Sequence, residues 1–416
     1  MLAPMPWLAT NAVKERTKLV LEWERRFNLA EGGRVNMAEL CRVFGVSRQT
    51  GYDWVNRYRA SGALDALVDR SRRPKTSPTK VGEEIETAIV AARKKFGWGG
   101  VKLRAVLAQS QPEIDWPSAS CISAVLDRNG LTKKQRKRRR TPIPVTRPFA
   151  SCDRPNAVWC IDFKGKFRLR DGTWCHVLTV VDAYSRFLLR AEVVKQPTGR
   201  EVERVLDGAF TEFGIPTAIR TDNGPPFAST GAGGLTTLSV WWLQLGIHVE
   251  RIQPGKPQQN GRQERLHRTL EEVVGTPATN ARTQQRAIDV WRRVYNEVRP
   301  HESLKLRTPD AVYERSSRRY PCKLKDTRDT THEPDEVYRL DNNGRLRWHR
   351  RWIHISNALG GAFVGVWRTR DSWTLFDVHF AGIPLGTFDT EQLPRGLRIP
   401  RRRRLKDGEV SGMSLD

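Results

Sequence analysis

The fold is decided by three stretches: AVWCIDFKGKF (157–167), WCHVLTVVDAYS (174–185) and RFLLRAEVV (186–194). They are rich in Val, Leu, Phe and Trp and are separated by short turns, which predicts a three-stranded antiparallel meander. The following segments predict a helix, a buried strand, a helix, a short strand and a further helix, at 199–213, 216–221, 236–245, 247–252 and from Asn260. Three strands followed by alternating helices and strands predict an α/β core with a mixed sheet, over 153–320.

Acidic residues stand at notable places in this core. Asp162 is in the middle of the first strand, Asp222 follows the strand 216–221, and Glu264 is one turn into the helix that begins at Asn260. A charged residue in a buried strand is costly unless something compensates for it. Adjacent strands would bring both aspartates to one edge of the sheet, and a helix packed on the sheet would add Glu264. A single Asp at a strand end is more often a turn residue, and Asp182 is the main alternative ligand.

Carboxylates that converge without a cation repel one another and raise their own pKa values. Mg²⁺ prefers such hard oxygen ligands. A pair of these ions activates the attacking oxygen and stabilises the leaving oxygen of an in-line phosphodiester displacement. Asp162, Asp222 and Glu264 are therefore the candidate metal ligands and catalytic residues.

The helix that carries Glu264 also presents basic side chains. His267, Arg268 and Glu271 lie on the same side of that helix as Glu264. We expect His267 and Arg268, with Lys256 in the preceding loop, to contact a DNA phosphate. For Arg268 a surface salt bridge with Glu264 is the alternative.

Residues 36–60 read NMAELCRVFGVSRQTGYDWVNRYRA and predict two short helices separated by a break at Gly45. This is the helix-turn-helix layout, in which the start of the second helix enters the major groove of DNA. The candidate DNA contacts are Arg48, Gln49, Thr50 and Arg57. An ordinary pair of core helices is the alternative.

The remaining segments predict a multidomain chain. An all-α helix-turn-helix domain (1–70) and a second helical, helix-turn-helix-like DNA-binding domain (80–132) precede the core. A proline-rich basic segment (71–80) and a basic linker (133–152, containing KKQRKRRR) connect these parts. Alternating apolar residues and turn signals predict a small all-β barrel at 335–392, followed by a basic disordered tail at 393–416.

Composition indicates the class of partner. The 72 Lys and Arg against 46 Asp and Glu give a formal net charge of +26, which favours a polyanion such as nucleic acid. No apolar run is as long as a transmembrane helix, and no secretion signal is visible, so we expect no membrane partner. Six cysteines without a CxxC pair fit a reducing cytoplasm.

The chain resembles a known family through TDNGPPF (221–227), GGLTTLSVWWLQLGI (233–247) and RIQPGKPQQNGRQERLHRTL (251–270). It is similar to integrase-type transposases of bacterial insertion sequences, whose D,D,E core also occurs in retroviral integrases. The resemblance extends to VNMAELCRVFGVSRQTGYDW and RPHESLKLRTPDAVYERS, at 35–54 and 299–316.

This resemblance implies a ribonuclease-H-like core, the triad Asp162, Asp222 and Glu264, and Mg²⁺ (or Mn²⁺) as cofactor, with two ions when DNA is bound. It implies that the N-terminal domains bind terminal inverted repeats in double-stranded DNA. Metal-activated water would cut at the element's end, and the freed 3′-hydroxyl would attack target DNA without a covalent protein intermediate. The expected location is the bacterial cytoplasm, at the nucleoid.

The chain also departs from the viral pattern. It lacks the spacing of their zinc-binding His/Cys domain, so no zinc is expected. The stretch between Asp222 and Glu264 is longer, and we expect ASTGAGGLTT (228–237) to form a loop. A homo-oligomer is expected because two DNA ends must be held at once. A catalytically silent DNA-binding regulator and a metal-dependent nuclease are the alternative functions.

Overall fold

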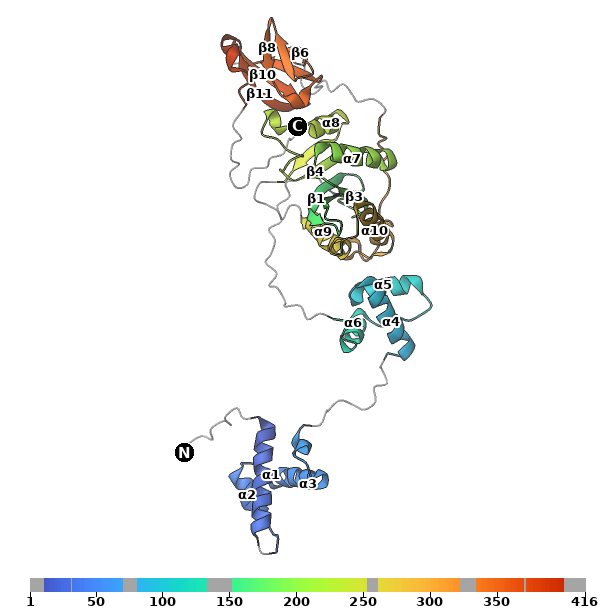
Figure 1. Ribbon diagram of the computed structural model, residues 1–416, viewed down its shortest axis with the longest axis vertical. Coiled ribbons are helices and arrows are strands. Elements are labelled where there is room, and N and C mark those ends of the chain that lie inside the picture. Colours follow the sequence, from blue (N-terminus) through green and yellow to red (C-terminus); the bar gives the residue numbers. More distant parts are fainter. Residues whose placement is uncertain are drawn as a thin grey trace. The chain divides into compact units, whose positions relative to one another are not determined.

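The computed structural model describes residues 11–30, 32–69, 81–132, 152–252, 261–321, 334–369 and 372–399. Lys256, the segment 71–80 and most of the predicted basic linker and tail lie outside them. The chain divides into two compact units, Met1–Val81 and Gly82–Asp416 (Figure 1). No helix in the described ranges is long and apolar enough to span a membrane.

The first unit contains helices α1 (Ala12–Leu29), α2 (Met37–Val43) and α3 (Arg48–Ser61) and a 3₁₀ turn (Leu64–Leu67). The side chains of Asn36 and Ser47 accept backbone N–H groups at the starts of α2 and α3, as N-caps do. A Cβ added to Gly51 would lie 2.3 Å from the Cys41 sulfur, so the two helices touch closely. The predicted helix-turn-helix is therefore present, and α1 covers it through Leu19, Val20 and Trp23.

The second unit begins with three helices, α4 (Glu83–Phe96), α5 (Gly100–Ser110) and α6 (Ala119–Arg128), close to the predicted positions. Gly97, with φ of 68°, ends α4 in the left-handed conformation that favours glycine. Apolar side chains from all three helices are buried, including Ile89, Leu103 and Ile122.

A five-stranded sheet forms the middle of this unit, in the order β3-β2-β1-β4-β5. Its strands are β1 (Val158–Arg168), β2 (Trp174–Asp182), β3 (Leu188–Val194), β4 (Ala218–Thr221) and β5 (His248–Arg251). β1, β2 and β3 are antiparallel, whereas β4 runs parallel to β1 and β5 parallel to β4. The predicted meander and mixed sheet are confirmed.

Helices cover both faces of the sheet. One face packs against α7 (Gly199–Phe213) and α8 (Thr237–Gln244), around the buried rings of Trp159, Phe210 and Trp242. The other packs against α9 (Gly261–Val274) and α10 (Ala281–Arg293), which a π-helical turn (Val294–Val298) continues (Figure 1). Trp242 is thus an anchor of the buried core.

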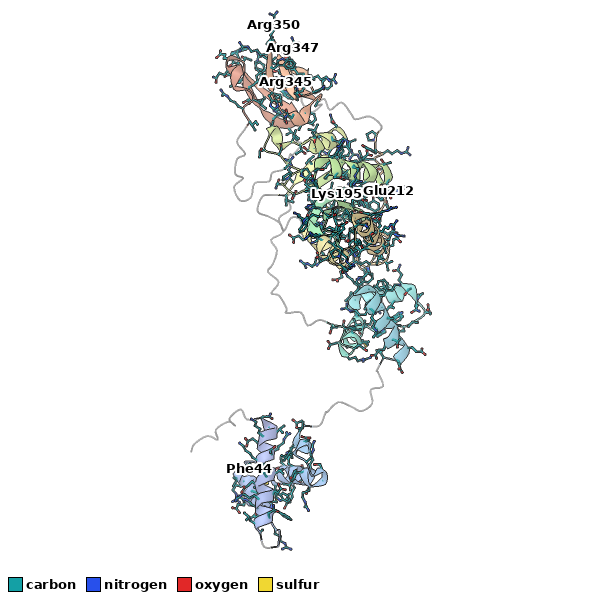
Figure 2. All side chains as sticks on the ribbon, viewed as in Figure 1. Phe44, Lys195, Glu212, Arg345, Arg347 and Arg350 are labelled. Atoms are coloured by element: carbon teal, nitrogen blue, oxygen red, sulfur yellow. The ribbon has the colours of Figure 1, made fainter. Side chains whose placement is uncertain are left out.

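Strands β6 (Glu336–Arg339), β9 (Phe363–Arg368), β10 (Leu375–Phe380) and β11 (Ile383–Asp389) form an antiparallel sheet in the order β11-β10-β9-β6. β7 (Arg345–Trp348) and β8 (Arg351–His354) form a separate hairpin, on which Arg345, Arg347 and Arg350 are labelled in Figure 2. The predicted all-β character holds for the described residues, but these are two sheets and not one closed barrel.

The Gly-rich segment after Asp222 contributes to this β core. Ala232, Leu235 and Val240 are buried in one cluster with residues of β9, β10 and β11. The expected loop is present, with a short 3₁₀ turn at Ala232–Gly234, and its small residues let the chain lie against the strands.

Candidate active site

Asp162 and Asp222 follow the paired segments of two neighbouring strands. In the parallel pair of β1 and β4, Cys160 is opposite Arg220. Asp162 is two residues beyond Cys160 on β1, and Asp222 is two residues beyond Arg220, directly after the end of β4. Because side chains alternate between the faces of a sheet, this register continued by two residues would carry both aspartates to the same level and toward the same face.

The environment of Asp222 favours a nearby cation. Burial raises the pKa of its carboxyl group, and the N–H of Gly224, 3.2 Å from Oδ1, partly opposes that shift. A positive charge beside a half-buried carboxylate would lower its pKa and offset the cost of desolvation.

Helix α9 brings Glu264 to the face that carries the two aspartates. Its residues Leu266, Leu270 and Val274 are buried in one cluster with Val158 and Cys160 of β1. Glu264 is in the first turn of α9 and is exposed. The helix therefore packs on the sheet through one side and presents a carboxylate to solvent at its start.

A hydrogen-bond chain joins α9 to the strand opposite Asp162. Thr179 on β2 is the cross-strand partner of Asp162 and is fully buried. Its hydroxyl donates to the Asp162 carbonyl oxygen (3.0 Å) and lies 3.0 Å from His267 Nε2. A hydroxyl has one proton, so Nε2 of His267 must be the donor in the second bond.

His267 is therefore held by the sheet. Burial, with a contribution from Lys164, lowers the pKa of His267 to about 4, so the ring is neutral at pH 7. The phosphate contact predicted for His267 has no support in this arrangement. Arg268 is exposed, and Glu271 pairs with Lys164 at 2.9 Å. Thr179 was missed from the sequence, although a lone polar residue within the apolar run VLTVV was a usable signal.

Asp182, the alternative ligand, serves as a turn residue. Its carboxylate oxygens accept hydrogen bonds from the backbone N–H groups of Asn156 and Ser185, both at 2.7 Å, and from the Ser185 hydroxyl at 2.6 Å. The side chain is fully buried, and burial raises its pKa. Its oxygens are already occupied, so it is not available to a metal ion.

The chemistry of the site fits Mg²⁺, although no ready-made cage is present. Among the described residues, no three His, Cys, Asp or Glu side chains are grouped closely enough to hold an ion. Asp162 and Asp222 nevertheless offer hard oxygen ligands just beyond the paired segments of β1 and β4, and a divalent cation would stabilise the half-buried carboxylate of Asp222. Mg²⁺ is commonly held by one or two carboxylates and completed by water and substrate phosphates.

The predicted DNA contacts on α3 have different surroundings. Arg48 and Gln49 are exposed in its first turn, and the Gln49 amide donates to Asp53 at 3.0 Å. Thr50 is half-buried beside Ser47. Arg57 instead donates to the Val68 carbonyl oxygen at 2.8 Å, and its guanidinium group lies 5.0 Å from the centre of the Trp54 ring. Arg57 is thus engaged within the first unit, and DNA contact by the exposed Arg48 and Gln49 stays a prediction.

Comparison with known proteins gives matches along most of the chain. Residues 153–257 and 245–309 match two models described as integrase core domain. Residues 18–75 match a helix-turn-helix domain and 50–126 a homeodomain-like domain.

Two insertion-element proteins are similar in sequence. The chain is 34% identical over 185 residues to the "Insertion element IS407 uncharacterized 31.7 kDa protein" of Burkholderia multivorans, over 43% of this chain and 63% of the relative. It is 29% identical over 234 residues to the "Insertion element IS476 uncharacterized 39.2 kDa protein" of Xanthomonas euvesicatoria, over 54% of this chain and again 63% of the relative. The chain thus spans less than two thirds of the length of either relative.

Among solved structures, the integrase catalytic core domain of HTLV-2 in complex with magnesium matches at 19% identity. The match covers 38% of this chain and 96% of that one, with a TM-score of 0.28.

Proposed function

We propose that this chain, which carries an integrase core domain and helix-turn-helix domains and is similar to insertion-element proteins, is a DNA transposase. It would bind the element's terminal inverted repeats, cut the DNA there and join the freed ends to target DNA. The observation that carries the proposal is the pairing of β1 with β4 as far as Cys160 and Arg220, each two residues before an aspartate, on the face where α9, the helix of Glu264, packs.

In this proposal Asp162, Asp222 and Glu264 hold Mg²⁺ or Mn²⁺, with two ions when DNA is bound. The metal would supply a low pKa for the attacking water and charge stabilisation for the leaving oxygen. Asp162 lies within β1 and Asp222 directly follows β4, so they would hold the metal ions that orient the scissile phosphate. His267, being neutral and bonded to Thr179, would position the start of α9 and contact no DNA.

The proposed reaction consists of two nucleophilic displacements at phosphorus atoms of DNA. In the first, a water oxygen attacks the phosphorus atom, the bond to the 3′-oxygen breaks, and that oxygen leaves as a 3′-hydroxyl. In the second, this 3′-hydroxyl attacks a phosphorus atom of target DNA and displaces the target's own 3′-oxygen. No Ser, Tyr or Cys nucleophile takes part.

The helix-turn-helix would read the inverted repeats. Arg48 and Gln49, exposed at the start of α3, would reach base edges in the major groove. Because two ends must be held together, we also propose a homo-oligomer on paired DNA ends. Sedimentation of the protein as a monomer on such DNA would argue against it.

The decisive experiment compares wild type with Asp162→Asn, Asp222→Asn and Glu264→Gln, which keep side-chain size and remove a charge. Glu272→Gln is the matched control, because Glu272 is also on α9 and pairs with Arg299. Each protein is assayed for binding and for Mg²⁺-dependent nicking of labelled DNA that carries the element's ends. Strand transfer is followed from a tagged 3′-hydroxyl end.

We expect the three variants to bind DNA but lose nicking by at least about 100-fold, and the control to nick normally. Wild-type binding without nicking in Mg²⁺ or Mn²⁺ would favour a silent regulator. Nicking without strand transfer would favour a nuclease. Nicking that survives the three substitutions would mean that the active site lies elsewhere.

A further inference from the structure

The β1–β2 hairpin extends beyond the segment in which β1 pairs with β4. Its end carries basic and aromatic side chains. Trp174 on β2 is 48% exposed, although most tryptophans of the core are buried. The Lys166 ammonium group lies 4.4 Å from the centre of its ring, and the Arg168 guanidinium carbon lies 5.9 Å from it. Both cations are exposed.

A further cation, Arg170, is exposed in the turn of the same hairpin. Trp174 is the cross-strand partner of Arg168, so these two side chains share one face of the sheet. We call Lys166, Arg168, Arg170 and Trp174 the hairpin patch.

The patch has little acidic compensation. Within the described part of the chain, none of its three cations forms an ion pair, in contrast to Lys164, which pairs with Glu271. Asp171 is the acidic residue in the turn, and its carboxylate accepts the backbone N–H of Thr173 at 2.9 Å. A cluster of unpaired cations around an exposed ring is costly for the free protein and attracts a polyanion.

The hairpin end is fixed in place. The backbone N–H of Arg170 donates to the Ala278 carbonyl oxygen, and that of Asp171 to the Thr279 carbonyl oxygen, both at 3.0 Å. The aromatic ring limits the freedom of the two cations above it. The patch is therefore preorganised, which reduces the entropy lost when it binds a ligand.

The patch also lies along the strand that carries Asp162. β4 pairs with β1 only at 158–160, so among the described residues β1 has no partner on that edge beyond Asp162. Lys166 is four residue steps along β1 from Asp162, which is about 13 Å. DNA rises about 3.4 Å per base pair, so this distance equals about four base pairs.

We propose that the hairpin patch binds the phosphate backbone of duplex DNA about four base pairs from the scissile phosphate, with Lys166 and Arg168 as the principal contacts. Trp174 holds these two cations in position. The DNA-binding role of the patch stands by itself, whereas its distance from the cut rests on the proposed function.

The first test measures binding without divalent metal, so that catalysis does not enter. The affinity of the full chain for a 30-bp duplex is measured by fluorescence anisotropy over a range of KCl concentrations. Lys166→Gln/Arg168→Gln is compared with Arg200→Gln/Arg204→Gln on α7, which removes the same charge from exposed positions.

Each phosphate contact contributes about 0.9 to the slope of log affinity against log salt concentration, so the hairpin variant should lower the slope by about 1.8. The α7 variant should leave the slope unchanged. Trp174→Ala should keep the slope and weaken binding about two- to five-fold, because the cations lose their platform. An unchanged slope in the hairpin variant, or an equal loss in the α7 variant, would overturn the proposal.

The second test locates the contact. Single phosphates three to five positions from the cut are replaced by neutral methylphosphonates, on either flank, and nicking is measured. On one flank, we expect the neutral substitution to reduce nicking by wild type. The same substitution should not reduce nicking by the hairpin variant any further, because that variant already lacks the contact. A full additional loss in the variant would refute the assigned position. If wild type binds with the expected slope but does not nick, the proposed function fails and the DNA contact stands.

Discussion

Replacing Thr179 with valine would remove one hydroxyl group and leave the shape of the side chain nearly unchanged. That hydroxyl donates to the Asp162 carbonyl oxygen and accepts from His267 Nε2, both at 3.0 Å. A neutral hydrogen bond contributes about 1 kcal/mol, and a buried donor left without a partner costs about 1–3 kcal/mol. We expect the free energy of unfolding of the catalytic core to fall by about 2 kcal/mol.

Urea unfolding of the full chain, followed through its catalytic-core transition, measures this change. A double-mutant cycle of Thr179→Val with His267→Ala should give a coupling energy of about 1 kcal/mol. Thr179→Ser keeps the hydroxyl and should keep the coupling, although it loses a buried methyl group. Nicking should decrease more than DNA binding, because the start of α9 loses its attachment to the sheet.

A coupling energy below about 0.3 kcal/mol would refute this reasoning, since additive effects are expected of residues that do not interact. Normal nicking by Thr179→Val, with the loss of stability confirmed, would show that the contact stabilises the fold without positioning Glu264.

Three further predictions concern other parts of the chain. Asp182→Asn would place an amide N–H group against the Asn156 N–H and the Ser185 hydroxyl, which already donate, so urea unfolding should show a loss of about 2–4 kcal/mol. The control Asp171→Asn, on the surface, should change the free energy of unfolding by less than about 0.5 kcal/mol. Gly51→Ala would force a methyl group against Cys41, so thermal unfolding of the first unit should show a loss of about 1–3 kcal/mol, and a gain would contradict the close packing. The pKa of His267 is lowered from 6.5 to about 4, so its contribution to stability is present above pH 6.5 and is lost as the pH falls toward 4. Between pH 7 and pH 4.5, the free energy of unfolding in urea should therefore decrease less for His267→Gln than for wild type.

Much of the core could be predicted because its signals are local. The apolar strands, their short turns and the caps Asn36 and Ser47 are each encoded within a few residues. The strand that carries Asp162 and the strand that precedes Asp222 are neighbours in the sheet, as expected, and the grouping of the two carboxylates stays a prediction. The first helix, 12–29, was not assigned, although Leu19, Val20 and Trp23 are buried on one side of it.

Contacts between distant residues could not be predicted in this way. The bond between His267 and Thr179 joins residues 88 positions apart and depends on the register of α9 over the sheet. Arg57 is a basic residue on the second helix of the helix-turn-helix, which is typical of a DNA contact. The chain folds back at Val68, however, and the Val68 carbonyl oxygen accepts a hydrogen bond from Arg57. The spacing of residues along one helix shows which side chains share a face. It does not show which other part of the fold, or which ligand, that face contacts.

Ala232 and Leu235 pack among the C-terminal strands. This contact divides the connection between Asp222 and Glu264 into two shorter spans. Gly233 makes this possible, because a Cβ there would lie 3.1 Å from Ile383 and its φ of 61° suits glycine. Each of these spans is shorter than the whole connection, so each closes at a smaller entropic cost than a single loop of the full length. A fragment truncated after residue 321 would expose this apolar seam to water, so an isolated core should aggregate more readily than the full chain.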